Sequence, residues 1–464
     1  MYSRITNCLV AAALLSAPLT GQQTDPNAGH SPPGEETTAT PIAASADRIL
    51  QAQADSQLRA LVAETLDRNP AVAGALARAR AAEHRASKVG ALPDPVLGIT
   101  AFLKSPETRT GPQVLTLNYL QSLPWLSKFD LEEQANLLNA TALYADVEAK
   151  RLDLATEVRR LYYELAFLVR HKEITKDFVD HLRQHEEISQ SRYATGTGAS
   201  QDVIKIQAEI TLAENLLLDI DQRRIDLEAS LNDLRDRSAS TVLLPAVLPA
   251  GEKVDLDIET LRESAIQSRP ELAAADARIA ASEARVRRAE KAFRPDFKVG
   301  LTYTFVDPRQ DQAGMISPPE GNGDDIFGIQ GGVSVPMWRK RTKAGVEEAS
   351  QIELAAREGK RDVLAGIESA IGDLMQRIPL TWQQYRLLKD ILILQAEESV
   401  QSAQSGYVSG TLNALDLLDA EHVLFRAEIS IARAQADYSI RLVQLEGVVA
   451  EPLQQIPMTE QSKP

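Results

Sequence analysis

Two histidines four residues apart are the most suggestive metal ligands in the chain. His181 and His185 occur in the segment His-Leu-Arg-Gln-His, and this spacing on a helix can present two imidazoles to one metal ion. The glutamate that follows the first histidine in a metalloprotease helix is absent. We therefore expect both histidines on a solvent-exposed helix face, and we predict no metal site.

No pattern typical of an enzyme stands out. The sequence shows no Ser/His/Asp order and no phosphate-binding loop. Its single cysteine, Cys8, rules out a disulfide framework or a thiolate metal cluster within the chain. We predict no catalytic residues and no cofactor.

Two aspartates offer a different chemistry. Asp416 and Asp419 stand three residues apart, so they share one face of a predicted helix. If several copies of the chain surrounded an axis, these carboxylates would form rings that favour cations. Unless the chain forms a pore, the two aspartates are better explained as solvated charges on a helix surface.

Composition favours long helices over a compact aromatic core. The chain has 464 residues, a net charge of −15 that is spread along the sequence, and only 5% aromatic residues. Alanine, leucine and glutamate, which favour helices, are abundant. No basic patch is present, so we predict no nucleic-acid partner.

The N-terminus has the pattern of an export signal. Arg4 precedes an apolar run, Leu9 to Leu15, that is too short to span a bilayer. We predict a signal peptide over 1–21, the alternative being a buried N-terminal helix, and a disordered tether over 22–50. No later segment has enough consecutive apolar residues for a membrane helix. If the protein crosses a membrane, it must do so as a closed barrel of strands.

The rest of the chain consists of two copies of one unit, and four pairs of anchors recur in the same order. The anchors are Pro70 and Pro270; Pro93-Asp94 and Pro295-Asp296; Ser122-Leu123-Pro124 and Ser334-Val335-Pro336; and the Tyr-x-x-Gly-Thr segments at 193–197 and 407–411, which Asp202 and Asp416 follow. We predict a first repeat over 51–237, a linker over 238–256, a second repeat over 257–450, and a flexible tail over 451–464.

Each repeat has the same predicted order of elements. A helix (56–90, 257–292) precedes two short alternating segments, a very long helical stretch (126–192, 339–406), a Gly-Thr turn, and a final helix (199–235, 412–449). A helix of about 67 residues would be about 100 Å long, which suits a duct better than a globular domain. Pro379 should kink or break the second long stretch.

The alternating segments are the membrane signal. Apolar residues occupy the odd positions from Phe297 to Phe305, and polar or small residues occupy the even positions from Lys298 to Thr304. In a strand, the two sets lie on opposite faces. Leu115, Leu117 and Tyr119 alternate in the same way. Strands that are apolar outside and polar inside suit a transmembrane barrel. The alternative is a soluble antiparallel sheet packed on helices.

These features together resemble the TolC-like outer membrane factors, over residues 50 to 450. The doubled Tyr-x-x-Gly-Thr turns, the Leu-Leu-Asp-Ala after the second turn, and the Pro-Asp before each first strand carry the resemblance. Leu92-Pro93-Asp94-Pro95 and Leu123-Pro124-Trp125 look most like the heavy-metal cation efflux branch.

The resemblance implies a mainly α-helical fold with a small transmembrane β part. In it, a homotrimer forms a twelve-stranded β-barrel in outer-membrane lipid, continued through the periplasm by an α-helical barrel. It also implies two partners, a periplasmic adaptor (membrane fusion) protein and an inner-membrane pump that is commonly proton-driven. The substrate would be metal cations or small toxic molecules. The alternative is a periplasmic coiled-coil adaptor or scaffold without a pore.

The resemblance also assigns roles to single residues. Asp202, Tyr407, Asp416 and Asp419 match the aperture that closes the periplasmic end. The glycine-threonine turns match the tips at which the adaptor docks, namely Gly196, Thr197, Gly410 and Thr411. The family has a basic residue just after the second Gly-Thr, and here that position is Leu412.

Overall fold

The computed structural model describes residues 45–453, all of which belong to one unit that begins at Pro41. The predicted signal peptide, most of the predicted tether, and residues 454–464 of the predicted tail lie outside the described range. Residues 45–50 correct the tether prediction, because they form helix α2 (Ser45–Ala52). Ile49 of α2 is buried with Leu152 and Ala450, so packing orders this segment.

A proline divides each predicted leading helix in two. The first half has α3 (Ser56–Arg68) and α4 (Pro70–Gly90), and the second has α7 (Ile258–Ser268) and α8 (Pro270–Glu290). Proline disfavours helical backbone in the residue before it and suits the first position of a new helix. Asn69 and Arg269 are therefore extended, and a new helix begins immediately after each.

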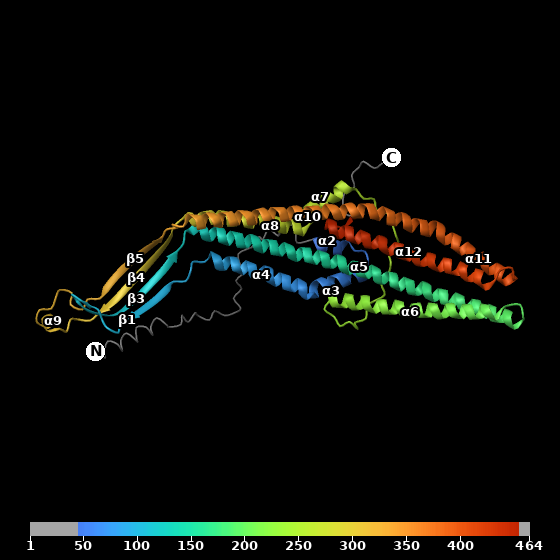
Figure 1. Cartoon of the computed structure of the whole chain (residues 1–464), viewed down its shortest axis with the longest axis horizontal. Coiled ribbons are helices and arrows are strands. Elements are labelled where there is room, and N and C mark those ends of the chain that lie inside the picture. The colour runs from blue at the N-terminus through green and yellow to red at the C-terminus, as the bar shows by residue number, and fades with distance from the viewer. Residues whose placement is uncertain (1–44, 454–464) are drawn as a thin grey trace, which may run out of the picture. The chain divides into compact units, whose positions relative to one another are not determined.

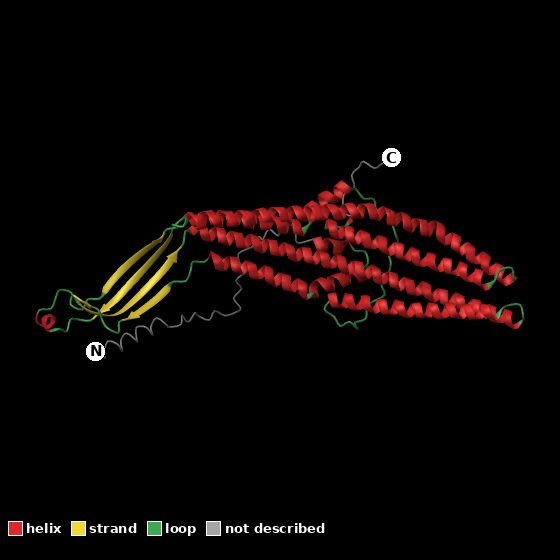
Figure 2. Cartoon of the chain, viewed as in Figure 1, coloured by secondary structure: helices red, strands yellow, loops and turns green. Residues whose placement is uncertain are grey.

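Four strands form one antiparallel sheet (Figures 1 and 2). They are β1 (Val96–Ala101), β3 (Gly111–Leu123), β4 (Asp296–Val306) and β5 (Ile326–Ser334), in the order β1-β3-β4-β5. The short β2 (Glu107–Thr108) pairs with β3. The β3–β4 pairing joins the two halves of the chain, so both halves contribute to one sheet.

The register of the sheet gives it two dissimilar faces. Leu301 lies opposite Tyr119 on one side and Ile329 on the other, and Leu97 continues this apolar face onto β1. On the polar face, Thr302 donates to Asn118 at 3.1 Å. The side chains of the apolar face lie in the open: Leu97 is 77% exposed and Ile329 is 74% exposed. The predicted alternation is therefore present, and none of the helices between residues 45 and 453 covers the apolar face.

Most of the remaining residues form long helices that run side by side (Figure 1). The first half has α5 (Leu126–Ala194) and α6 (Ser200–Leu234). The second half has α10 (Arg339–Leu387), the π-helical turn η3 (Leu388–Leu392), α11 (Ile393–Ser409) and α12 (Ala414–Val449). Two short elements, η2 (Lys291–Phe293) and α9 (Gln312–Ile316), flank β4. Between residues 45 and 453, no helix is both long and apolar enough to span a bilayer.

The repeat read from the sequence recurs in the contacts. The residue that precedes α4, Asn69, donates through its amide to the carbonyl of Leu234 at 2.9 Å. The residue that precedes α8, Arg269, donates to the carbonyl of Val448 at 3.1 Å. In both halves the residue before α4 or α8 therefore donates to a carbonyl at the C-terminal end of α6 or α12, which would otherwise have no partner within its own helix.

The π-turn η3 absorbs one extra residue in the second half. Val158 and Ile371 occupy equivalent core positions with an offset of 213, as do Leu161 and Leu374. Beyond η3, the equivalent tyrosines, Tyr193 and Tyr407, are offset by 214. A π-turn holds one more residue than an α-turn, so η3 accounts for the difference. Helix α10 continues through Pro379 to Leu387, so of the predicted kink or break the break does not occur, and the kink stays a prediction.

The π-turn should make a one-residue deletion harmless there and costly elsewhere. Deleting Ile391, which is exposed within η3, should restore an α-helix and keep both flanking registers. Deleting Ala365 from the regular part of α10 should rotate its neighbours by about 100°. It would then displace buried side chains such as Ile367, at a cost of about 2–5 kcal/mol.

Thermal unfolding of the purified protein, followed by circular dichroism, compares the two deletions. We expect a midpoint near that of the parent for the Ile391 deletion and a clear drop for the Ala365 deletion. Equal drops would contradict this account of η3.

Candidate functional site

The two helix reversals, α5 to α6 and α11 to α12, lie at the same end of the helical region (Figure 1). Gly196 and Gly410 adopt φ of 75° and 80°, a region that glycine enters without steric cost. The amides of Thr197 and Thr411 donate to the carbonyls of Arg192 and Gly406, both at 2.9 Å, so each helix ends in the same closed turn.

Threonine hydroxyls make each turn self-contained. Thr197 Oγ1 donates to the carbonyl of Arg192 at 3.2 Å, and Thr411 Oγ1 donates to that of Gly406 at 3.1 Å. Both threonines are exposed. Since the turns satisfy their own polar groups, they present a fixed shape at the outer end of the helices.

Arg192 organises the space between the two turns. Its guanidinium lies over the ring of Tyr407, 4.6 Å from the centroid, and donates to the backbone carbonyl of Tyr407. A cation held over an aromatic face is stabilising. The sequence reasoning missed Arg192, although a signal was present: the tip of the first half has an arginine where that of the second half has Gly406.

Tyr407 and Asp202 do not meet within one chain. Tyr407 is only 2% exposed and is packed among the side chains behind the turns. Between residues 45 and 453 its hydroxyl has no hydrogen-bond partner, and the carboxylate of Asp202 likewise has none. The role at the aperture that the resemblance assigns to both residues stays a prediction.

Leu412 has a local reason to be apolar. A side chain placed at Gly406 would lie 2.7 Å from Cδ1 of Leu412, so Leu412 covers the backbone where the glycine leaves room. Leu412 therefore packs against the backbone at Gly406. In this chain Arg192 brings the positive charge to Tyr407 instead.

The predicted aperture aspartates are exposed near the start of α12. Asp416 accepts from the amide of Asn413 at 3.3 Å, while its own amide donates to Asn413 Oδ1 at 3.1 Å. This reciprocal capping satisfies donors that would otherwise be orphaned at the helix start. Asp416 therefore also stabilises the N-terminal end of α12. The side chain of Asp419 makes no ion pair within the described residues.

His181 lies on an exposed face as predicted, whereas His185 corrects the prediction. His185 is 3% exposed, and its Nε2 lies 2.8 Å from Oε1 of Glu421, which is equally buried. His181 is half exposed, with Nδ1 3.6 Å from the other oxygen of Glu421. His185 is buried because this face of α5 packs against α12. The described residues contain no group of three metal-ligating side chains, and the pair joins the two halves of the chain.

An acidic cavity of about 310 Å³ lies beside this pair, lined by Asp177, Asp180, His181, Glu421 and Glu428 among others. Burial, together with the nearby charge of Asp177, raises the pKa of Glu428 above its usual range. Stacking of Phe178 on Phe425, with centroids 4.3 Å apart, closes one side of the contact between α5 and α12. Negative charge thus collects toward the turn end of the helices.

These features define a class of protein in which a small two-faced sheet continues into long helical hairpins with glycine turns. The family model for outer membrane efflux proteins matches residues 61–234 and 261–451, and the chain belongs to that family. Nodulation protein T of Rhizobium leguminosarum bv. trifolii is 23% identical over 416 residues, which is 83% of each chain. Outer membrane protein TolC of Vibrio cholerae is 24% identical over 353 residues, covering 72% of this chain and 75% of TolC.

Solved structures agree on the fold. The crystal structure of the outer membrane protein VceC from Vibrio cholerae superposes with a TM-score of 0.70 at 20% identity, covering 86% of this chain and 97% of VceC. The resemblance read from the sequence and the mainly helical fold class are thereby confirmed. The chain is an outer-membrane channel of tripartite efflux that extends into the periplasm, and the alternative of an adaptor without a pore is set aside.

The buried pair should matter more than an exposed one. Glu421→Ala leaves Nε2 of His185 buried without a partner, which should cost about 1–3 kcal/mol, whereas Glu421→Gln keeps a hydrogen bond and should cost less. The control is Glu209→Ala, which removes the more exposed contact of Glu209 with His422 at 3.2 Å and should cost under about 1 kcal/mol. Thermal unfolding midpoints of the three variants give the order, and equal losses at Glu421 and Glu209 would refute it.

Proposed function

We propose that three copies of this chain form a passive export duct. Each copy contributes β1, β3, β4 and β5 to one closed twelve-stranded barrel in the outer membrane, and the long helices form a tunnel through the periplasm. The duct performs no chemistry and needs no cofactor. The observation that carries the proposal is the exposed sheet with one apolar and one polar face.

The apolar face suits lipid. Leu97, Leu301 and Ile329 lie on three different strands and are all exposed in one chain, which would be unfavourable in water. Lipid removes that penalty and leaves the polar face, with Asn118 and Thr302, toward a wet lumen.

The two edge strands of the sheet have backbone groups that are free to pair with further strands. Strands β1 and β5 each pair on one side only. Unpaired backbone groups cost several kcal/mol in a bilayer, and pairing β5 of one copy with β1 of the next satisfies them. This closure supports a ring of copies over a single chain in the membrane.

The turn end supports docking and gating. The exposed turns with Gly196, Thr197, Gly410 and Thr411 are the proposed contact with a periplasmic adaptor. That adaptor links the duct to an inner-membrane pump, commonly proton-driven. The exported substrates are metal cations or small toxic molecules, which the pump rather than the duct selects.

The aperture would lie at the same end. Asp416 and Asp419 of each copy would face an axis as rings of carboxylates, which attract cations and oppose anions. Tyr407 and Asp202, which have side-chain polar atoms without partners within one chain, would bond between neighbouring copies and hold the aperture narrow.

Arginine substitutions on adjacent residues of β4 test the barrel. Leu301→Arg should cost about 2–4 kcal/mol if the residue faces lipid near the midplane, and it should abolish assembly. Thr302→Arg, one residue away on the polar face, should assemble normally. Outer-membrane fractions run on denaturing gels with and without heating would reveal the trimer, and equal tolerance of the two arginines would argue against the barrel.

Charge removal at the aperture tests the gate. Asp416→Asn combined with Asp419→Asn should lower cation selectivity in planar bilayers and weaken block by multivalent cations, because the ring charge is lost. Asparagine at 416 keeps a side-chain oxygen for the cap with Asn413. The matched control removes two exposed charges on α6, through Asp226→Asn and Asp233→Asn. Unchanged selectivity and block in the 416/419 variant would place these aspartates outside the pore.

A further inference from the structure

The four long strands of the sheet contain very few charges. Among the residues of β1, β3, β4 and β5, only Asp296 and Lys298 are charged, and both belong to β4. Asp296 is held at the junction with the helices, where its Oδ1 accepts from Nζ of Lys128 at 2.7 Å and from the amide of Trp125 at 3.0 Å. Between residues 45 and 453, the ammonium group of Lys298 has no ion-pair or hydrogen-bond partner. Lys298 is therefore the one uncompensated charge of these strands.

Lys298 lies on the polar face of the sheet. Its partners across the register are Ser122 on β3 and Gly332 on β5. The alternation of β4 places it on the same face as Thr302, which donates to Asn118. The side chain is exposed. In the proposed barrel this face lines the lumen, so the ammonium group would stand in the water of the duct.

The residues around Lys298 on this face are small or neutral. A Cβ atom added at Gly332 would lie 3.6 Å from Cβ of Lys298, so this strand position brings no side chain beside the lysine. Gly300, two residues along β4, is covered by the uncharged side chain of Gln330, whose Nε2 would lie 2.6 Å from an added Cβ atom. The positive charge is therefore unopposed on its own part of the face.

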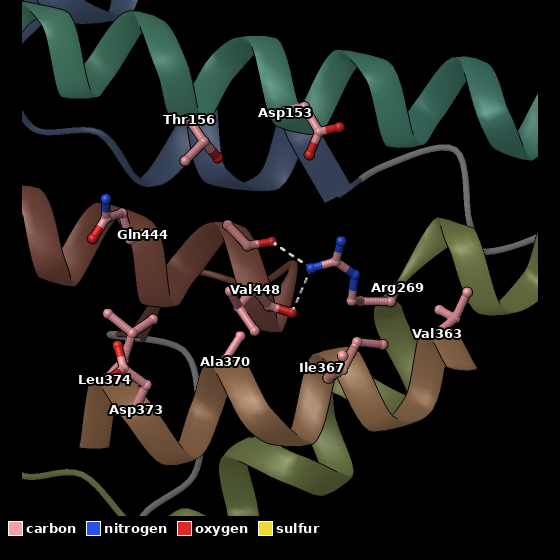
Figure 3. A pocket seen from close by; sticks show the side chains of 12 residues that line it. Asp153, Thr156, Arg269, Val363, Ile367, Ala370, Asp373, Leu374, Gln444 and Val448 are labelled. Carbon is pink, nitrogen blue, oxygen red and sulfur yellow. Dashed lines mark hydrogen bonds between the residues drawn. The ribbon is translucent and has the colours of Figure 1, made fainter. Parts of the chain in front are cut away.

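The cation beside a cavity among the helices is different. This cavity, of about 580 Å³, is lined by residues of α5, α10 and α12 and by Arg269 (Figure 3). The guanidinium of Arg269 donates to the carbonyls of Gly447 and Val448 at 3.3 and 3.1 Å and forms an ion pair with Glu271. Its charge is compensated within the chain, so this cavity does not attract anions as Lys298 does.

We propose that Lys298 gives the barrel section of the duct a preference for anionic solutes, such as those with carboxylate or phosphate groups. The inference rests on the proposed duct, because three copies would place three ammonium groups at one level of the lumen. Rings of lysine or arginine side chains favour anions in pores. The preference is opposite in sign to the one proposed for Asp416 and Asp419 at the turn end of the helices.

The dimensions of the proposed barrel let the three charges act across the whole lumen. Twelve strands that are about 4.8 Å apart and tilted by about 40° enclose a circle with a radius of about 12 Å. Side chains extend inward from this circle, so the axis lies within about one Debye length, about 8 Å at physiological ionic strength, of each ammonium group. Salt therefore screens the charges only in part, and anions concentrate at this level.

Two sections of opposite charge in one duct make the current depend on the direction of the voltage. When the periplasmic side is positive, cations enter through the aspartate rings and anions enter through the Lys298 ring, and both accumulate in the tunnel between them. The opposite voltage drains both kinds of ion from the tunnel. The conductance is therefore higher with the periplasmic side positive.

Charge substitutions at position 298 test the inference in the full-length chain. In planar bilayers with a KCl gradient, Lys298→Gln should lower the permeability ratio of chloride to potassium by about twofold or more and should reduce the voltage asymmetry, because the ring charge is lost. Lys298→Arg keeps the charge and should retain the parent's values, whereas Lys298→Glu should lower the ratio further. The matched control is Lys253→Gln, between α6 and α7, where Lys253 pairs with Asp255 at 3.1 Å. It should change neither value.

Thiol accessibility tests the direction of the side chain, with Cys8→Ser as background. In the assembled channel, Lys298→Cys should react with water-soluble methanethiosulfonates. A positively charged adduct should restore the parent's permeability ratio, and a negatively charged adduct should lower it. Val299→Cys, on the apolar face, should not react, because it would face lipid.

The outcomes separate this inference from the proposed function. Conducting trimers of Lys298→Gln with an unchanged permeability ratio and voltage asymmetry would overturn the inference while the duct stands. An equal change in Lys253→Gln would overturn it as well, since the effect would not belong to the lumen. Absence of any conducting trimer in the parent protein would remove both. A lower ratio in Lys298→Gln, with the parent's ratio in Lys298→Arg and Lys253→Gln, would support the inference.

Discussion

Close packing around α5 is the constraint on which the helical region depends. This helix of 69 residues contacts α4, α6, α8 and α12, so it packs against neighbours along its whole length. Alanine is the most frequent residue at its buried positions, as at Ala135, Ala142, Ala155 and Ala166. Small side chains let several helices approach at once, while larger residues such as Tyr162 and Leu165 fill the wider section where α3 joins. The sheet is connected closely to the helices, because only two residues separate the end of β3 from the start of α5.

Sequence patterns predicted well the elements whose periodicity has one clear solution. Strand β4 alternates strictly from Phe297 to Phe305, so its two faces could be assigned before any contact was known. The long helices and the glycine turns were read from uninterrupted helix formers that end in Tyr-x-x-Gly-Thr. The division at Asn69 was missed, although proline at position 70 carries the signal, because the apolar spacing continues across it.

The errors arose where tertiary contacts, rather than local pattern, decide the environment. The neighbours of His185 in the sequence are polar and charged, which favours an exposed position. The side chain is nevertheless buried, because it contacts Glu421, a residue far along the chain. Likewise, the placement of Arg192 over Tyr407 joins residues from different halves. The aperture residues could be named only through the family, because a single chain leaves Asp202 and the hydroxyl of Tyr407 without a partner.

The π-turn at Leu388–Leu392 shows how a long helix can accept an inserted residue during evolution. Once a unit has been duplicated, each copy accumulates its own insertions, and a long helix ordinarily rejects them because every later side chain would turn away from its neighbours. A local over-wide turn confines the disturbance to a few residues. The length mismatch between the halves is thus a trace of separate histories after duplication, and it marks the segment where the lineage found room to vary without losing its architecture.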